Sequence, residues 1–148
     1  MRKAILTSIF TAFVTFISFA QIEPVEWEFA SSNVEEDIYE LVFTATIDEG
    51  WYIYSQFMGD DGPVPTSFEY DESDGYALEG EATEEGEAVK GYSEIFEMEI
   101  IKYGDQVVFK QKVKVSDSSE AIEGYLTFMS CDKNRCLPPE DVDFSFEF

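Results

Sequence analysis

The sequence predicts an all-β protein, an antiparallel β-sandwich of the immunoglobulin type. Apolar and polar residues alternate along most of the chain, clusters of turn-forming residues separate the alternating runs, and no stretch shows convincing helical periodicity. In Ile38–Ile47 every odd-numbered position is apolar, and in Val142–Phe148 every even-numbered position is apolar. Such alternation is typical of strands that have one buried face and one solvated face.

Strands are expected near Trp27 and over Ile38–Ile47, Trp51–Phe57, Ser67–Tyr70, Tyr76–Gly80, Glu94–Tyr103, Gln106–Val115, Glu123–Met129 and Val142–Phe148. Turns are expected at Asp48–Gly50, Gly59–Pro63, Asp74–Gly75, Gly104–Asp105 and Asp117–Ser119. The segment Glu79–Lys90 is rich in Glu and Gly and poor in apolar residues, so it is expected to be a mobile surface loop. About eight or nine short strands at this spacing favour the immunoglobulin-type sandwich.

The N-terminus has the features of an export signal. Arg2 and Lys3 precede an uncharged apolar stretch, Ala4–Phe19, which is short for a membrane span. Small residues at Ser18 and Ala20 predict cleavage after Ala20. Residues 1–20 are therefore expected to be a signal peptide and residues 21–148 a single mature domain. The alternative is an anchor helix that is not cleaved.

The charge balance excludes several classes of function. The chain has 32 acidic and 9 basic residues, and removal of Arg2 and Lys3 makes the formal net charge of −23 more negative still. Such a field repels phosphate backbones, so no nucleic-acid partner is expected. The chain contains no histidine, which excludes a Ser-His-Asp triad, a Cys-His pair and a His-rich zinc site.

The two cysteines, Cys131 and Cys136, are the candidate reactive residues. Cysteines of an exported protein normally pair, and these two are separated by four charged or turn-forming residues. They are therefore expected at the mouth of a hairpin-like loop, exposed at one end of the sandwich. A ring this short stabilises a fold by only about 2 kcal/mol, against nearly 5 kcal/mol for a ring of about 100 residues. Lys133 and Arg135 lie within the loop, where cations stabilise a thiolate. On the residues alone, a redox-active cysteine pair and a purely structural disulfide are equally consistent with the sequence.

Four segments together resemble the N-terminal periplasmic domain of the transmembrane disulfide reductase DsbD. They are Gly50–Ser55, the turn from Gly62 to Thr66, Gly91–Phe96, and Cys131–Cys136 with the trailing Leu137–Pro139. No single motif is highly specific to this family. The order of the four segments and the number of cysteines are together fairly specific. The resemblance covers the chain from about Trp27 to Phe148.

This resemblance implies an immunoglobulin-like fold and a periplasmic protein that carries reducing equivalents without an organic cofactor or metal. Cys131 and Cys136 would cycle between dithiol and disulfide, with Cys136 favoured as the sulfur that bonds to the partner. The implied partners are a membrane-embedded or thioredoxin-like electron donor and exported thiol–disulfide client proteins. The sequence stops at Phe148, so the donor is expected to be a separate chain, and a monomer is expected.

The resemblance also implies supporting residues around the cysteines. Tyr52 and Tyr54 match aromatic positions that line the family's cysteine site, although at least one of them could simply pack in the core. The family shields its cysteines with an aromatic side chain of a cap loop. Here the aromatic is absent at the matching place and Tyr92 lies a little later, so Val89 and Tyr92 are the candidates to cover the sulfurs, and Glu87 loosely matches an acidic position.

Three functions therefore compete. The leading one is thiol–disulfide exchange in the cell envelope, which leaves open whether the protein is an enzyme or an electron carrier. The second is an immunoglobulin-like binding module whose disulfide is purely structural. A calcium-dependent surface domain is a third and weaker candidate, because no twelve-residue calcium-binding loop is present.

Overall fold

The computed structural model describes residues 22–59 and 61–148, and every regular element in these ranges is a β-strand. The strands are β1 (Val25–Glu35), β2 (Ile38–Ile47), β3 (Tyr52–Tyr54), β4 (Ser67–Tyr70), β5 (Tyr76–Ser93), β6 (Met98–Val115), β7 (Ile122–Phe128), β8 (Ser130–Cys131) and β9 (Glu140–Phe146). The all-β prediction is thus confirmed. The expected signal peptide, residues 1–20, lies outside the described residues.

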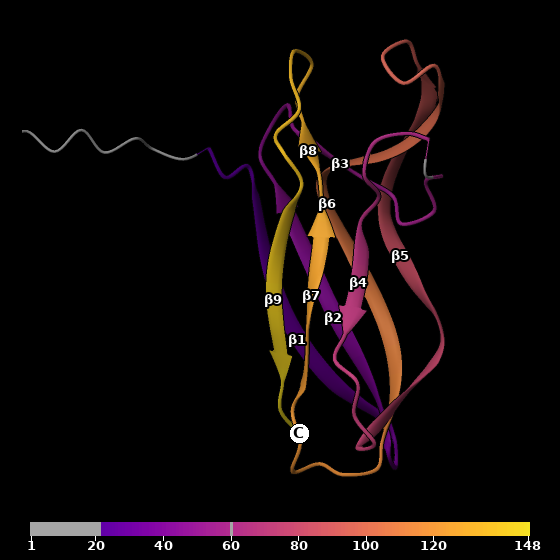
Figure 1. Cartoon of the computed structure of the whole chain (residues 1–148), viewed down its shortest axis with the longest axis vertical. Helices are drawn as coiled ribbons and strands as arrows, with labels where there is room; N and C mark the ends of the chain where they lie inside the picture. The colour runs from indigo at the N-terminus through magenta and orange to yellow at the C-terminus, as the bar shows by residue number, and fades with distance from the viewer. Residues whose placement is uncertain (1–21, 60) are drawn as a thin grey trace, which may run out of the picture.

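The strands form two antiparallel sheets that pack face to face in an elongated sandwich (Figure 1). The larger sheet has the order β1-β2-β6-β3-β8, with β5 on the other edge of β6, and the smaller sheet has the order β4-β7-β9. Among the described residues no helix is long and apolar enough to cross a membrane.

The core lies between the two sheets and is built from the apolar positions of the alternating runs. Phe43 on β2 is at its centre, with ring centroids 4.6 Å from Phe68, 5.0 Å from Phe144 and 5.3 Å from Phe146. Phe109 on β6 is also fully buried. Burying each such ring contributes roughly 1.5–3 kcal/mol, so the alternation seen in the sequence specifies which faces of the sheets meet.

The prediction of a mobile loop over Glu79–Lys90 is wrong. This segment belongs to β5, which pairs with β6 on the edge of the larger sheet, with register shifts between Glu79 and Thr83 and between Gly86 and Ala88. Backbone hydrogen bonds to β6 hold the strand, while most of its side chains remain exposed. Hydrophobic alternation is absent because an edge strand with two solvated faces does not need it, and acidic side chains protect such an edge from further pairing.

The predicted turn at Gly104–Asp105 is also wrong, because β6 runs through both residues. They form a bulge in which Asp105 has a φ of 70°. On one side of the bulge β6 pairs with β2, up to Gln106, and on the other side it pairs with β3, from Tyr103. Gly104 fits here because a Cβ atom would lie 3.3 Å from the carbonyl oxygen of Trp51 and from the ring of Tyr52. The bulge therefore allows β3 to replace β2 beside β6.

The cysteine segment begins where the chain crosses between the sheets. β7 ends at Phe128 in the smaller sheet, and β8 begins at Ser130 in the larger sheet, where it pairs with β3. Only Met129 separates the two strands, and it is buried. Cys131 is consequently anchored in the framework at the upper end of the sandwich in Figure 1.

Replacing the central aromatic should destabilise the fold strongly. Phe43→Ala is expected to lower the free energy of unfolding by about 3–5 kcal/mol, because the cavity would be enclosed by other core rings. Phe57→Ala is the control, since Phe57 is 61% exposed, and its effect should stay within about 0.5 kcal/mol. Urea denaturation followed by tryptophan fluorescence measures both values, and equal effects would contradict this account of the core.

Candidate redox site

Cys131 and Cys136 are joined by a disulfide within a short hairpin, Ser130–Leu137, called here the cysteine hairpin. The two residues face each other across an antiparallel bridge, with Cα atoms 4.0 Å apart. On one side of this pair the Leu137 N–H donates to the Ser130 carbonyl at 2.9 Å, and on the other the Asp132 N–H donates to the Arg135 carbonyl at 2.9 Å. Backbone pairing therefore aligns the two sulfur-bearing residues.

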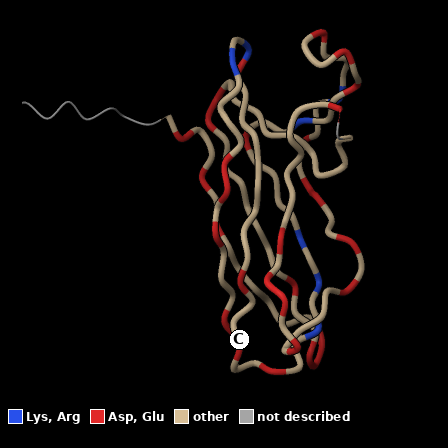
Figure 2. Tube along the Cα trace, in the orientation of Figure 1, with Lys and Arg blue, Asp and Glu red and all other residues tan. Residues whose placement is uncertain are grey.

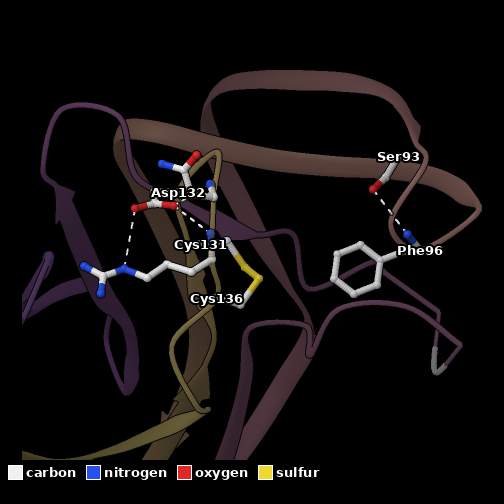
Figure 3. The surroundings of a disulfide bond; sticks show 7 residues. Ser93, Phe96, Cys131, Asp132 and Cys136 are labelled. Carbon is white, nitrogen blue, oxygen red and sulfur yellow. Dashed lines mark hydrogen bonds and ion pairs between the residues drawn. A yellow bond between two sulfur atoms is a disulfide. The ribbon is translucent and has the colours of Figure 1, made fainter.

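The Asp132 side chain closes the turn of this hairpin. Its Oδ1 accepts hydrogen bonds from the N–H groups of Asn134 at 2.6 Å and Arg135 at 2.8 Å. Its Oδ2 lies 3.7 Å from Nε of Arg135 (Figure 3). The Asn134 N–H is the main cause that lowers the pKa of Asp132, so this carboxylate stays ionised at neutral pH. These bonds support the shape of the turn alongside the disulfide.

The two cysteines differ in exposure. Cys131 is 3% exposed and packs with Tyr54, Ile100 and Met129 in a small apolar cluster, whereas Cys136 is exposed at the surface. An incoming thiolate can therefore reach the Cys136 residue far more easily than Cys131. This asymmetry is what a pair needs if one sulfur bonds to a partner and the other resolves the mixed disulfide.

A cleft of about 360 Å³ lies beside the disulfide. Besides the residues from Cys131 to Cys136, its lining includes Tyr54 and a set from the end of β5, the β5–β6 turn and β6, namely Ser93, Ile95, Phe96, Ile100 and Lys102. Figure 3 shows the Phe96 ring and the disulfide on facing sides of this space. The disulfide is thus approached through a partly apolar opening.

Phe96 is the aromatic residue that the fold brings to the cysteines. The turn Glu94–Glu97 joins β5 to β6, and Ser93 Oγ accepts a hydrogen bond from the Phe96 N–H at 3.4 Å. The Phe96 ring packs edge-on against Tyr54, with centroids 6.2 Å apart. Sequence reasoning missed this role, although Phe96 ends one of the motifs that carried the resemblance.

Val89 and Tyr92, the two cap-loop candidates, lie elsewhere. Both are on β5, 47% and 63% exposed, and neither lines the cleft. Glu87 is an exposed residue of the same strand. Val89 and Tyr92 are three residues apart in a regularly paired part of β5, so their side chains point to opposite faces of the strand.

The two tyrosines singled out from the sequence lie next to Cys131 in different ways. Tyr52 pairs with Cys131 through the backbone, and its ring lies under the Lys102 ammonium, 3.9 Å from the centroid. Tyr54 is 4% exposed and packs in the cluster that holds Cys131. Burial raises the pKa of Tyr54, so its hydroxyl stays protonated at neutral pH.

The two cations of the cysteine hairpin lie beside the cleft that borders the disulfide. Lys133 and Arg135 both line the cleft. The Arg135 guanidinium also lies over the Trp51 ring, 5.7 Å from its centroid, which tethers the hairpin to the residue before β3.

Glu84 forms a polar clamp that sequence reasoning did not find. Its carboxylate accepts hydrogen bonds from Ser55 Oγ at 2.5 Å, the Gln56 N–H at 3.0 Å and Tyr103 Oη at 2.9 Å. Burial, and then the bond to Glu84, raise the pKa of Tyr103. The clamp ties β5 to β6 and to the segment that follows β3, and so supports the end of the sheet that carries Cys131. Within the residues that the structure describes, no three potential metal ligands are grouped together.

These features define a class: a β-sandwich that carries an accessible disulfide hairpin at one end. Residues 20–147 match the family described as "Thiol:disulfide interchange protein DsbD, N-terminal", and the chain belongs to this family. The recognition made from the sequence motifs is therefore confirmed. The DsbD N-terminal domain is a periplasmic domain that acts with thiol–disulfide partners.

Solved structures agree with this assignment at the level of the fold. The N-terminal domain of DsbD from Neisseria meningitidis, in its reduced form, aligns with a TM-score of 0.58 and 20% identity, covering 84% of this chain and 86% of that one. The N-terminal periplasmic domain of ScsB from Proteus mirabilis aligns with a TM-score of 0.64 and 16% identity, covering 88% of this chain and 49% of that one. The immunoglobulin-like sandwich is thus confirmed. The comparison with curated proteins finds no match.

Removing the aromatic ring that faces the disulfide should expose the bond further. Phe96→Ala is expected to speed reduction of the disulfide by dithiothreitol roughly two- to tenfold, since exchange rates depend on access to the sulfur. Tyr92→Ala is the matched control, because Tyr92 is an exposed aromatic residue on β5 that does not line the cleft. Stopped-flow fluorescence gives both rates, and a larger effect at Tyr92 would show that Phe96 does not shield the bond.

Proposed function

We propose that this protein relays reducing equivalents in the periplasm through the Cys131–Cys136 pair. It receives them from a membrane-embedded or thioredoxin-like donor and passes them to exported thiol–disulfide proteins. Residues 1–20 act as the signal peptide that directs export and are removed after Ala20. The observation that carries the proposal is the pairing of an exposed Cys136 with a buried Cys131 in a hairpin at the tip of the sandwich.

Reduction of the protein follows from this asymmetry. A donor thiolate attacks Sγ of Cys136, the bond between Cys136 and Cys131 breaks, and Cys131 leaves as a thiolate with the electron pair. The second donor thiolate then attacks the donor sulfur of the mixed disulfide. This step forms the disulfide of the donor and releases Cys136 as a thiolate. The donor ends as a disulfide and this protein as a dithiol, so two electrons have been transferred.

Delivery to a client is the same chemistry in reverse. The Cys136 thiolate attacks one sulfur of the client disulfide, the client S–S bond breaks, and the other client sulfur leaves as a thiolate. The Cys131 thiolate then attacks Sγ of Cys136, which re-forms the Cys131–Cys136 disulfide and releases the second client sulfur as a thiolate. The charges of Lys133 and Arg135 stabilise the Cys136 thiolate that starts this step. The backbone bonds of the cysteine hairpin keep Cys131 beside Cys136 while the two sulfurs are not bonded to each other.

The alternative, a binding module with a structural disulfide, is less well supported. The disulfide closes a ring with a sequence separation of 5, within a turn already held by backbone and Asp132 bonds. It therefore adds little to the stability of the sandwich. A bond that contributes so little to the fold, and lies so exposed at Cys136, is better explained by its reactivity.

The reduction potential separates the two functions. Equilibration against glutathione and dithiothreitol buffers should give a potential between roughly −180 and −270 mV, the range of proteins that exchange disulfides. The ratio of dithiol to disulfide at each buffer composition is measured by mass after alkylation. A potential below about −300 mV would identify a structural disulfide and overturn the proposed relay.

Single cysteine variants test the assigned roles. Cys131→Ser leaves the exposed Cys136 without its resolving partner and should accumulate mixed disulfides with periplasmic proteins. Cys136→Ser leaves only the buried Cys131 and should accumulate severalfold less. Non-reducing gels of the two variants, expressed at equal levels, give the comparison. Stronger trapping by Cys136→Ser would reverse the roles.

A further inference from the structure

Six of the seven basic residues that the structure describes gather in two places, and the seventh, Lys90, lies on β5. Lys110, Lys112 and Lys114 form a stripe on β6, along the body of the sandwich. Two of these three are engaged with carboxylates, Lys110 with Glu85 at 2.8 Å and Lys114 with Asp37 at 3.3 Å. Lys102, Lys133 and Arg135 line the cleft beside the disulfide instead. Almost half of the chain's described cations are therefore within reach of a protein that reacts with Cys136.

The acidic groups near the cleft are distributed unevenly. On the cysteine side, Asp132 is the acidic residue of the hairpin, and its carboxylate accepts hydrogen bonds within its own turn and pairs with Arg135 at 3.7 Å. Lys133 is the hairpin cation that forms no ion pair with the described residues. The β5–β6 hairpin on the other side of the cleft carries the exposed residues Glu94, Glu97 and Glu99. Figure 2 shows blue at the loop between β8 and β9 and red in the neighbouring hairpin. The cleft lining thus includes three cations, Lys102, Lys133 and Arg135, and one carboxylate, Asp132, while the exposed glutamates lie on the neighbouring hairpin.

We propose that the redox partner carries acidic side chains next to its reactive cysteine, and that these contact Lys133 and Arg135. This inference rests on the proposed function and specifies the partner's chemistry. An acidic partner is repelled by the body of a chain with formal net charge −23, and it is attracted where cations gather, at Lys133, Arg135 and Lys102 beside the cleft. Attraction at the tip combined with repulsion elsewhere orients the partner so that its cysteine arrives at Cys136.

Exposed apolar residues border the same opening and suit such a docking surface. Ile95 in the β5–β6 turn is 81% exposed and lines the cleft. Specific interfaces commonly combine an apolar centre with charged residues at the rim. The partner is therefore expected to place an apolar contact over Ile95 and its carboxylates over the cysteine hairpin.

The test uses two synthetic peptides with the same Cys-x-x-Cys dithiol, one flanked by glutamates and one by lysines. The rate of disulfide reduction is measured with each peptide at low ionic strength, for the unmodified protein, Lys133→Glu and Lys112→Glu. The two variants change the net charge equally, but Lys112 lies on the β6 stripe and does not line the cleft. Lys133→Glu should lower the ratio of the glutamate-peptide rate to the lysine-peptide rate by about threefold or more, and Lys112→Glu by much less.

Equal shifts in this ratio for both variants would overturn the inference, because net charge alone would then account for the preference. The effect of Lys133→Glu should also shrink at about 0.5 M salt, where exposed charges are screened. Reduction by uncharged dithiothreitol separates this result from the proposed function. Normal reaction with dithiothreitol, together with an exchange-range potential, would leave the relay standing even if the charge preference is absent.

Discussion

β6 pairs with three other strands, and the place where it changes partners decides where the cysteines lie. Up to Gln106 it is bonded to β2, and from Tyr103 it is bonded to β3, with the Gly104–Asp105 bulge between. β3 in turn pairs with β8, which contains Cys131. Without this change β3 would have no edge to join, and the cysteine hairpin would have no support from the larger sheet.

The framework and the reactive end of the molecule are stabilised in different ways. The aromatic core around Phe43 holds the two sheets together, whereas the cysteine end relies on polar clamps and a small apolar cluster. Glu84 ties three segments together there, and Asp132 closes the hairpin turn. Neither the aromatic core nor the Glu84 clamp includes a cysteine. The core and the disulfide are thereby separated in space.

Many of the acidic residues lie on the surface of the sandwich and on an edge strand of its larger sheet. β5, one edge of the larger sheet, is rich in glutamate, and charged edges resist pairing with other chains. The same charge makes the cationic cysteine hairpin distinct from the rest of the surface. A positive site on a negative protein is a stronger orienting feature than the same site on a neutral one, because approach elsewhere is opposed.

The sequence by itself determined the features that depend on neighbouring residues. Alternation in Ile38–Ile47 identified a half-buried strand, because strand side chains point to opposite faces in turn. The hairpin between Cys131 and Cys136 also followed from local residues, since four turn-forming or charged residues can do little but reverse the chain. The immunoglobulin-like sandwich followed from the number and spacing of such runs.

Only the tertiary structure decided the rest, because it depends on backbone partners that are distant in the sequence. Glu79–Lys90 is a strand because β6 pairs with it, and its own composition carries no trace of that pairing. The β5–β6 pairing places the turn that joins the two strands beside the disulfide, so that Phe96 in this turn lines the cleft and Val89 and Tyr92 on β5 do not. The unequal exposure of Cys131 and Cys136 likewise arises from the cluster around Tyr54, whose members come from separate strands and loops. Local pattern encodes the strands, and long-range packing assigns each residue near the disulfide its place.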